Sequence, residues 1–235
     1  NLTNLIQLYL YYNQFSGSIP KELGDLKCLM DIAISENQLS GSIPVSIGNL
    51  SNLEYLSLQT NQFSGSIPTT FGNLNRLVNL SLFQNHLSGP IPSEFGNLIS
   101  LKFLFLSQNN LTRAIPKSLG NLTNLIQLYL YYNQLSGSIP KELGDLKFLI
   151  DMGIGENQLN GPIPVAIGNL SSLRRLQLRD NQISGTVPEE LRNLKKLAFM
   201  LLAQNQFSGP LPELLCQNAT LQFIAVSGNM LSGPI

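Results

Sequence analysis

Apolar residues recur along this chain with a fixed period of 24 residues. From Leu5 onward, the pattern L-x-x-L-x-L-x-x-N-x-L-S-G-x-I-P-x-x-L-G-N-L-x-x occurs nine times in full, and a tenth copy stops at Ile235. A constant period of this length is typical of a solenoid, in which each repeat stacks only on its neighbours. We therefore expect residues 1–235 to form one array of nine full repeats and a partial tenth.

Each part of the repeat predicts a short local element. The L-x-L core, as at Leu56 and Leu58, alternates apolar and polar residues and indicates a short strand. The Ser-Gly-x-Ile-Pro part, as in residues 40–44, predicts a second extended segment and a turn. The Leu-Gly-Asn-Leu part has room only for a 3₁₀-like turn. Stacking predicts an α/β-class solenoid with a parallel sheet on its concave face and 3₁₀ turns on its convex face.

The ninth position of the repeat is asparagine in every copy. A buried amide both donates and accepts, so it can satisfy backbone groups at the bend that leaves the strand. We expect a ladder of these side chains along the solenoid. Its members are Asn13, Asn37, Asn61, Asn85, Asn109, Asn133, Asn157, Asn181, Asn205 and Asn229.

A longer period lies over the short one. Residues 1–31 match residues 121–151 except at positions 15, 28 and 30, an offset of five repeats. We interpret this match as a block duplication. It produces two tyrosine-rich strands, and both need not be functional.

The Ser-Gly-x-Ile-Pro element and the 24-residue period, seen in residues 120–125 and 135–144, resemble the plant-specific class of leucine-rich repeats. The chain is most similar to ectodomains of plant leucine-rich-repeat receptor-like kinases, in the branch related to MDIS1-interacting receptor-like kinase 2. This resemblance covers all 235 residues. Polygalacturonase-inhibiting proteins and kinase-less receptor-like proteins use the same repeat.

The resemblance implies a glycoprotein sensor on the extracellular face of the plasma membrane, with a role in immunity. Its ligand would be a secreted peptide or elicitor on the inner strand face, closed over by a co-receptor ectodomain. A transmembrane helix and a serine/threonine kinase would follow in the full-length protein. Because the family's cysteine-bearing caps are missing at both ends, we expect this chain to be an interior fragment.

Outward positions of the first strand predict where a ligand binds. They are the third, fifth, seventh and eighth of each repeat, and small polar residues are expected there. Contiguous exposed aromatic residues indicate a contact surface, although stacking of cross-strand neighbours would also explain them. The first-repeat copy, Tyr9, Tyr11 and Tyr12, is explained equally well by the duplication. The aromatic candidates are Phe83, Phe103, Phe105, Tyr129 and Tyr131, with Tyr132, Phe199 and Leu201 beside them.

Charged residues cluster on the same face and complete the predicted ligand-binding set. Asp151 and Glu156 lie in the seventh repeat, and Arg175 and Arg179 lie in the eighth. Equal repeat positions face one another, so we expect Arg175 to pair with Asp151. Arg179 would sit between Gly155 and Ala203 without an opposing side chain, which makes it the better candidate for a ligand carboxylate.

The bulk composition excludes several classes of function. Charged residues are 12% of the chain and the formal net charge is zero, which disfavours nucleic acid and anionic lipid as partners. No apolar run is long enough to cross a membrane, so membrane attachment would come from a segment outside this chain.

The histidine and cysteine content gives no support for catalysis, a cofactor or a metal site. One histidine leaves no credible catalytic pair, and the two cysteines lack metal-ligand spacing. We expect Cys28 to be packed as Phe148 is in the duplicate. Cys216 could pair with a cysteine beyond Ile235. His86 is expected to be a solvated loop residue.

Seven Asn-x-Ser/Thr sequons fit a secreted glycoprotein, although the repeat generates several of them automatically. A glycan on Asn79 would block part of the concave face. Arg113 replaces a repeat glycine and is expected to open the local turn. The sequons are at Asn1, Asn49, Asn79, Asn110, Asn121, Asn169 and Asn218.

Two other functions stay open at this point. A secreted inhibitor of a microbial wall-degrading enzyme would bind a folded protein partner with the same type of solenoid. An ice-binding solenoid would need flat, regular rows of threonine, and the outward positions here are irregular.

Overall fold

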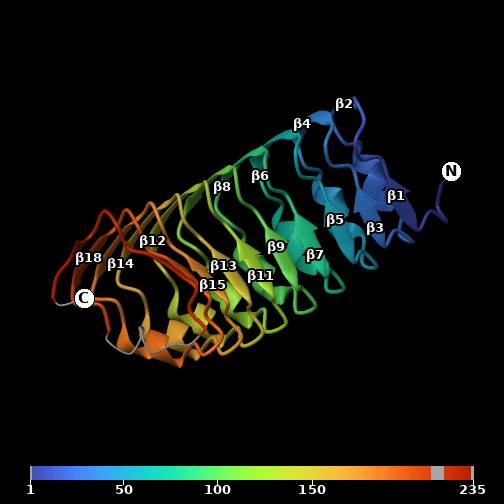
Figure 1. The fold of residues 1–235 in the computed structure, drawn as a ribbon. Coiled ribbons are helices and arrows are strands. Elements are labelled where there is room, and N and C mark those ends of the chain that lie inside the picture. Colours follow the sequence, from blue (N-terminus) through green and yellow to red (C-terminus); the bar gives the residue numbers. More distant parts are fainter. Residues whose placement is uncertain (1, 213–219, 234–235) are drawn as a thin grey trace.

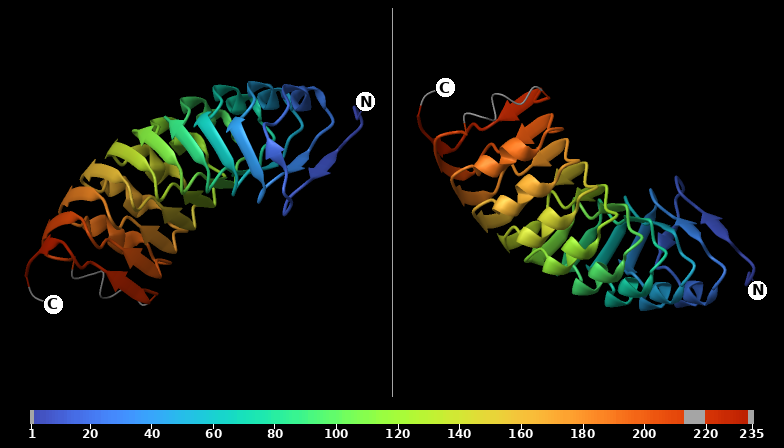
Figure 2. Two further views of the ribbon diagram at one scale, coloured as in Figure 1. Left: turned by 90° about the horizontal axis from the view of Figure 1, so that it is seen from above. Right: turned by 90° about the horizontal axis from the view of Figure 1, so that it is seen from below.

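The computed structural model describes residues 2–212 and 220–233, which form a single curved stack of similar coils. Figure 1 shows the two ends of the chain at opposite ends of the stack. Each coil carries a strand, a second short strand and, in most repeats, one turn of 3₁₀ helix. Figure 2 shows the 3₁₀ turns in a row along one side of the stack. The predicted solenoid is confirmed.

The first strands of the repeats form one parallel sheet on the concave face. Each strand pairs with the next in constant register, so a residue faces the one 24 positions later, as Leu8 faces Ile32. The strands are β1 (Gln7–Tyr9), β3 (Asp31–Ala33), β5 (Tyr55–Ser57), β7 (Asn79–Ser81), β9 (Phe103–Phe105), β11 (Gln127–Tyr129), β13 (Asp151–Gly153), β15 (Arg175–Gln177), β17 (Phe199–Leu201) and β19 (Phe223–Ala225).

The Ser-Gly segments form a second parallel ladder, as the sequence predicted. Here a residue faces the one 22 positions later, as Ser16 faces Gln38. The strands are β2 (Ser16–Gly17), β4 (Gln38–Ser42), β6 (Gln62–Ser66), β8 (His86–Gly89), β10 (Asn110–Arg113), β12 (Gln134–Ser138), β14 (Gln158–Gly161), β16 (Gln182–Gly185), β18 (Gln206–Gly209) and β20 (Met230–Leu231).

Each 3₁₀ turn begins directly after the repeat proline, whose extended backbone ends the preceding segment, as at Pro20. The turns stack closely: a Cβ atom added at Gly24 would lie 2.3 Å from the carbonyl oxygen of Ser46, so this position requires glycine. The turns are η1 (Lys21–Asp25), η2 (Val45–Asn49), η3 (Thr69–Asn73), η4 (Ser93–Asn97), η5 (Lys117–Asn121), η6 (Lys141–Asp145), η7 (Val165–Asn169) and η8 (Glu189–Asn193).

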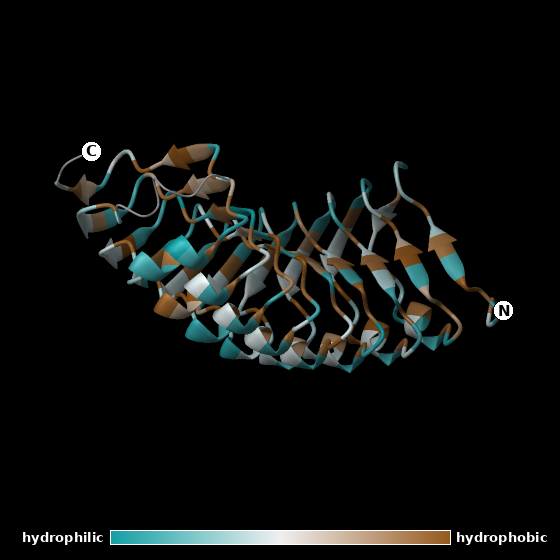
Figure 3. Ribbon diagram, turned by 60° about the horizontal axis from the view of Figure 1, so that its bottom comes forward, coloured by the Kyte–Doolittle hydropathy of each residue, from teal (hydrophilic) through white to brown (hydrophobic). Residues whose placement is uncertain are grey.

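The core runs the length of the stack as one column of leucine, isoleucine and phenylalanine. Leu56 and Leu58 are fully buried, and Phe63 and Phe71 are among the largest fully buried side chains. Figure 3 shows apolar and polar residues alternating along the coils, as a period of two requires in a strand. One repeat alone could not bury these side chains, so stability comes from stacking.

The asparagine ladder forms as predicted. The Nδ2 of Asn109 donates to the carbonyl oxygens of Leu82, Leu106 and Ser107 at 3.0–3.2 Å, and its Oδ1 accepts from the backbone N–H of Leu87 at 3.0 Å. Each inner asparagine thereby bonds backbone groups of its own coil and of the coil before it. The ladder fixes the bend after the strand and the spacing between coils.

Two local predictions are wrong. Arg113 does not open its turn: it adopts the left-handed conformation of the repeat glycine (φ 67°) and stays in β10, opposite Leu135. The sheet pairing therefore imposes the conformation on a residue that disfavours it. Cys28 is exposed rather than packed, and so is its counterpart Phe148, because this position follows the 3₁₀ turn and faces solvent.

Replacing a ladder asparagine by alanine should destabilise the chain strongly. Asn109→Ala would leave three carbonyls and the N–H of Leu87 without these bonds in a buried site, a cost of about 2–4 kcal/mol. Urea unfolding measures the change. The matched control, Asn73→Ala, alters an exposed asparagine whose side chain makes no hydrogen bond among the described residues, and should change the unfolding free energy by less than about 0.5 kcal/mol. Equal losses in both variants would refute this role of the ladder.

Candidate ligand-binding face

The aromatic side chains predicted on the concave face form a contiguous run across β9 and β11. The ring of Phe105 stacks on that of Tyr129, with centroids 5.1 Å apart. Phe103 lies 6.2 Å from Phe105, and Tyr131 lies 5.6 Å from Tyr129. Tyr132 meets Tyr131 edge-on at 6.0 Å. We call these five residues the aromatic run.

Phe83 does not join the aromatic run. No ring contact among the described residues includes it, and its side chain is only half-buried. It occupies the seventh position of its repeat, where the following repeat has Ser107 and not an aromatic residue. The structure therefore brings four of the five predicted aromatic candidates together and leaves Phe83 apart.

A buried carboxylate continues the aromatic run toward the C-terminal repeats. The hydroxyl of Tyr129 donates to Oδ2 of Asp151 at 2.9 Å, and Nη1 of Arg175 donates to the same oxygen at 3.2 Å. The guanidinium of Arg175 also lies 5.1 Å from the ring centre of Phe199, a cation–π geometry. The predicted pair of Arg175 and Asp151 is confirmed.

Burial shifts the pKa values of Asp151 and Tyr129. It raises the pKa of Asp151, while the hydrogen bond from Tyr129 and the charge of Arg175 lower it in part. Burial and the neighbouring Asp151 also raise the pKa of Tyr129 to about 12. Tyr129 therefore stays a neutral hydrogen-bond donor at physiological pH. The second oxygen of Asp151, Oδ1, is buried without a hydrogen bond.

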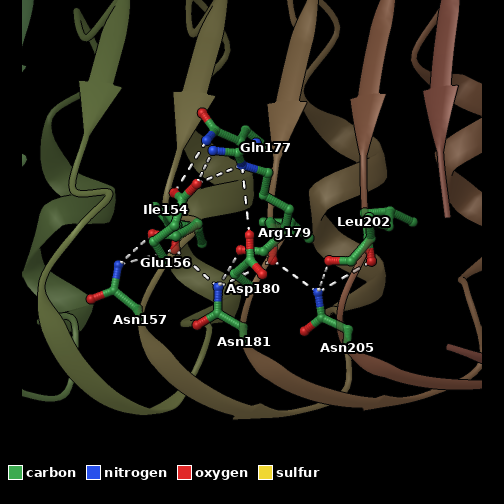
Figure 4. Close-up of polar contacts among 12 residues, drawn as sticks. Ile154, Glu156, Asn157, Gln177, Arg179, Asp180, Asn181, Leu202 and Asn205 are labelled. Carbon is green, nitrogen blue, oxygen red and sulfur yellow. Dashed lines mark hydrogen bonds and ion pairs between the residues drawn. The ribbon is translucent and has the colours of Figure 1, made fainter. Parts of the chain in front are cut away.

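The expectation that Arg179 has no opposing side chain is wrong. Its guanidinium reaches sideways and forms an ion pair with Oε1 of Glu156, and Nε2 of Gln177 donates to Oε2 of the same carboxylate at 3.3 Å (Figure 4). The hydrogen bond with Glu156 raises the pKa of Arg179, whereas burial raises that of Glu156. The positive charge predicted for a ligand carboxylate is thus already paired within the chain.

Two glycines that the sequence reasoning did not single out allow these contacts. A Cβ on Gly153 would lie 3.1 Å from Tyr131 and 3.3 Å from Tyr129, and one on Gly155 would lie 2.9 Å from the backbone oxygen of Arg179. The missing side chain of Gly153 leaves space for the two tyrosines to lean over β13, and that of Gly155 permits the close approach of the next coil. A signal was present, because five repeats earlier the equivalent residues are Ala33 and Ser35.

One hollow of the molecule lies away from this face. It has a volume of about 680 Å³ and is lined mainly by the prolines and small residues that precede the 3₁₀ turns, such as Pro164 and Pro188. Its lining offers no aromatic ring and no cation. We therefore place the candidate site on the concave face, where aromatic and charged groups meet.

The sequons differ in their surroundings. Asn49, Asn121 and Asn169 end 3₁₀ turns and are exposed, and Asn110 is exposed at the start of β10. Asn79 lies on the concave sheet between Tyr55 and Phe103, with its Oδ1 buried. The remaining two sequons, Asn1 and Asn218, and also Cys216, lie outside the described residues.

Three further findings concern residues 2–212 and 220–233. No helix in them has the length and hydropathy that crossing a membrane requires. They contain no cluster of three or more histidine, cysteine or acidic side chains suited to a metal ion. His86 is exposed and begins β8, so it is a strand residue and not a loop residue.

The sequence model of the Leucine Rich Repeat family matches six segments of the chain, at residues 4–26, 52–74, 76–98, 100–122, 124–146 and 172–194. These segments make up more than half of its length, and the chain belongs to the leucine-rich-repeat family. The search of curated proteins found no match.

Solved structures include close relatives of this fold. A TDR receptor is 35% identical over 100% of this chain and 41% of its own, with a TM-score of 0.97. The Arabidopsis receptor kinase HAESA, solved with the peptide hormone IDA and the co-receptor SERK1, is 33% identical over 100% of this chain and 48% of its own, with a TM-score of 0.67. A plant ice-binding protein is 32% identical over 98% of this chain and 73% of its own, with a TM-score of 0.84.

The chain spans less than half the length of these two receptors. Its repeats are similar to the ectodomains of plant receptor kinases along its whole length. This shared fold is a binding scaffold and not a catalytic domain.

The pKa of Tyr129 leads to a titration that can be checked. A phenol whose pKa rises from 10.0 to about 12 on folding contributes stability that is complete below pH 10 and is lost as the pH rises through 12. Followed by tyrosinate absorbance, Tyr129→Phe should abolish one ionisation near pH 12. Tyr131→Phe removes a neighbouring phenol that does not bond to Asp151, and should keep that ionisation. Persistence of the step in Tyr129→Phe would contradict the assignment.

Proposed function

We propose that this chain is part of the extracellular domain of a plant receptor kinase, and that it binds a secreted peptide or elicitor on its concave face. The observation that carries the proposal is the aromatic run, five adjoining rings on an outward sheet face. Rings in such numbers on a sheet face supply large contact area at low entropic cost, which suits a binding hot spot. The similarity to HAESA, which was solved with a peptide hormone and a co-receptor, supports the same type of partners here.

The surroundings of the aromatic run suggest how a ligand would lie. Phe83 is on the N-terminal side of the run, and Phe199 and Leu201 are on the C-terminal side. An extended peptide crossing β7 to β17 would contact the rings in its centre. Arg175 would contact it at the border, where the guanidinium is partly exposed beside its carboxylate. Glu156 and Arg179 form a neutral pair farther along the same border.

We propose the remaining parts of the full-length protein from its similarity to plant receptor kinases. A membrane helix and a cytoplasmic serine/threonine kinase would follow the ectodomain, and the protein would act at the plasma membrane. The assignment to the MDIS1-interacting branch and to immunity stays a prediction, because the relatives above support the receptor class and not this branch.

Two alternative functions would use other surfaces of the same solenoid. A secreted enzyme inhibitor would bind a folded protein along the side of the solenoid. The similarity to a plant ice-binding protein supports the ice-binding alternative. The second ladder carries glutamines such as Gln38, Gln62 and Gln134 at one repeat position, but His86 and Asn110 interrupt this row. The irregular concave face argues against ice as its ligand. Inhibition of ice recrystallisation by the chain would favour this alternative over the receptor.

Glycan positions provide one test of the concave site. We expect the exposed sequons at Asn49, Asn110, Asn121 and Asn169 to carry glycans in protein secreted from plant cells. Asn79 should be free of glycan, because its side chain is partly buried between Tyr55 and Phe103. Peptide mapping after enzymatic deglycosylation in heavy-oxygen water reports each site. A glycan on Asn79 in folded protein would oppose ligand binding across β7.

Crosslinking tests the ligand site directly. The glycosylated chain would be incubated with secreted plant and microbial peptide fractions, crosslinked and analysed by mass spectrometry. We expect a short peptide attached near Phe105, Tyr131 or Arg179. Combining Phe105→Ala with Tyr131→Ala should lower the yield at least about tenfold, since both remove central contact area.

The control variant is Phe148→Ala, which removes an exposed aromatic ring from the connection between η6 and β13, outside the aromatic run, and should leave the yield unchanged. Crosslinks from a folded enzyme along the second ladder would replace the receptor proposal by the inhibitor alternative.

A further inference from the structure

The duplicated blocks have diverged in a way that points to a second binding site. The offset that relates residues 1–31 to residues 121–151 also relates Asp31 to Asp151 and, just beyond the matching block, Glu36 to Glu156. In the C-terminal copy, these two carboxylates hold the guanidinium groups of Arg175 and Arg179. In the N-terminal copy, the corresponding residues are Tyr55 and Gln59, which carry no charge at neutral pH.

The N-terminal carboxylates consequently have no cationic partner. Oδ2 of Asp31 accepts from the hydroxyl of Tyr9 at 2.9 Å and from Nε2 of Gln7 at 2.6 Å. The carboxylate of Glu36 raises the pKa of the Tyr12 hydroxyl. None of the salt bridges in the described part of the chain includes either carboxylate. Two negative charges therefore stand on this face without compensation, whereas the copy neutralises both.

A hollow lies over these carboxylates. Its volume is about 490 Å³, and it is enclosed by residues of the first three repeats. The rings of Tyr9, Tyr11 and Tyr12 form one wall, with Tyr11 6.2 Å from Tyr9 and 5.8 Å from Tyr12. Tyr55 and Gln59 form the opposite wall, and the small side chains of Ala33 and Ser35 contribute to the lining.

The chemistry of this hollow suits a guanidinium group. Carboxylates accept its forked N–H groups, and tyrosine rings stack on its planar face. The C-terminal copy shows the fit within this protein: the same aspartate and glutamate each bind an arginine there, and the same tyrosine donates to the aspartate. In the C-terminal copy of the site, two arginines of the chain bind the carboxylates. In the N-terminal copy, no arginine of the chain does so.

We propose that the hollow formed by Tyr9, Tyr11, Tyr12, Asp31, Glu36 and Tyr55 binds arginine side chains of a peptide ligand. The inference rests on the proposed function and deepens it, because it names the side chain that the N-terminal part of the concave face would select. Arginines of the ligand would take the places that Arg175 and Arg179 occupy in the copy. The aromatic run would contact an apolar part of the same ligand.

The test uses the whole chain and a defined probe, the peptide acetyl-Gly-Arg-Gly-Arg-Gly-amide, titrated by calorimetry at low salt. We expect one binding site. The peptide with citrulline in place of both arginines has the same shape without the charge, and should bind at least about tenfold more weakly. Equal binding of the two peptides would overturn the proposal.

Removal of the carboxylate charges locates the site. Asp31→Asn combined with Glu36→Gln should weaken the arginine peptide at least about tenfold. The control, Glu22→Gln with Asp25→Asn, removes the same charge from exposed positions of η1 on the convex side and should leave binding unchanged. The same loss in both double variants would show general charge attraction and would overturn the proposal.

The duplication also allows a reciprocal exchange. Tyr55→Arg with Gln59→Arg should fill the hollow from within and abolish binding of the probe. Arg175→Tyr with Arg179→Gln should empty the second copy and raise the stoichiometry from one to two. Circular dichroism would verify folding, and an unchanged stoichiometry in a folded variant would contradict the proposal. Crosslinking at Phe105 and Tyr131 reports separately on the proposed function, so either proposal can fail without the other.

Discussion

The asparagine ladder is the interaction on which the rest of this structure depends. Each inner ladder side chain bonds three carbonyls and one N–H across two coils, as Asn109 does. These bonds hold every coil at the same bend and the same distance from its neighbour. The fixed register then brings each outward residue beside its counterpart 24 positions later, as Phe105 lies beside Tyr129. The residues exposed on the concave face therefore form a regular array. Their identities at four positions of each repeat determine the chemical character of this face.

The N-terminal and C-terminal halves of this face differ in how their carboxylates are paired. In the C-terminal half, Asp151 and Glu156 are held by arginines of the next repeat, so both carboxylates have a cationic partner within the chain. In the N-terminal half, Asp31 accepts hydrogen bonds from Tyr9 and Gln7, and no described salt bridge includes Asp31 or Glu36. A difference of two residues per block thus changes the charge of the surface while the backbone stays the same. Such divergence after duplication gives one scaffold two surfaces with different preferences.

The similarity to plant receptor kinase ectodomains fits this division of roles. A solenoid separates stability from recognition, because the buried leucines and the ladder serve the first and the outward positions serve the second. Substitutions on the concave face then alter recognition at little cost in folding. The left-handed backbone of Arg113 shows the reverse dependence. Here the pairing of the second strand ladder imposes its geometry even on a residue that disfavours it.

The sequence by itself determined the solenoid, both strand ladders, the 3₁₀ turns and the pairing of Arg175 with Asp151. The pairing of Arg175 with Asp151 depends on equal positions facing one another, whereas the second ladder pairs residues 22 positions apart. Only the tertiary structure decided contacts that run diagonally between repeats, such as Arg179 with Glu156. A long side chain can lean across the sheet to a different repeat position of the neighbouring strand, which the period alone does not reveal. The tertiary structure also showed which carboxylates lack a cation, because that depends on where flexible side chains come to rest.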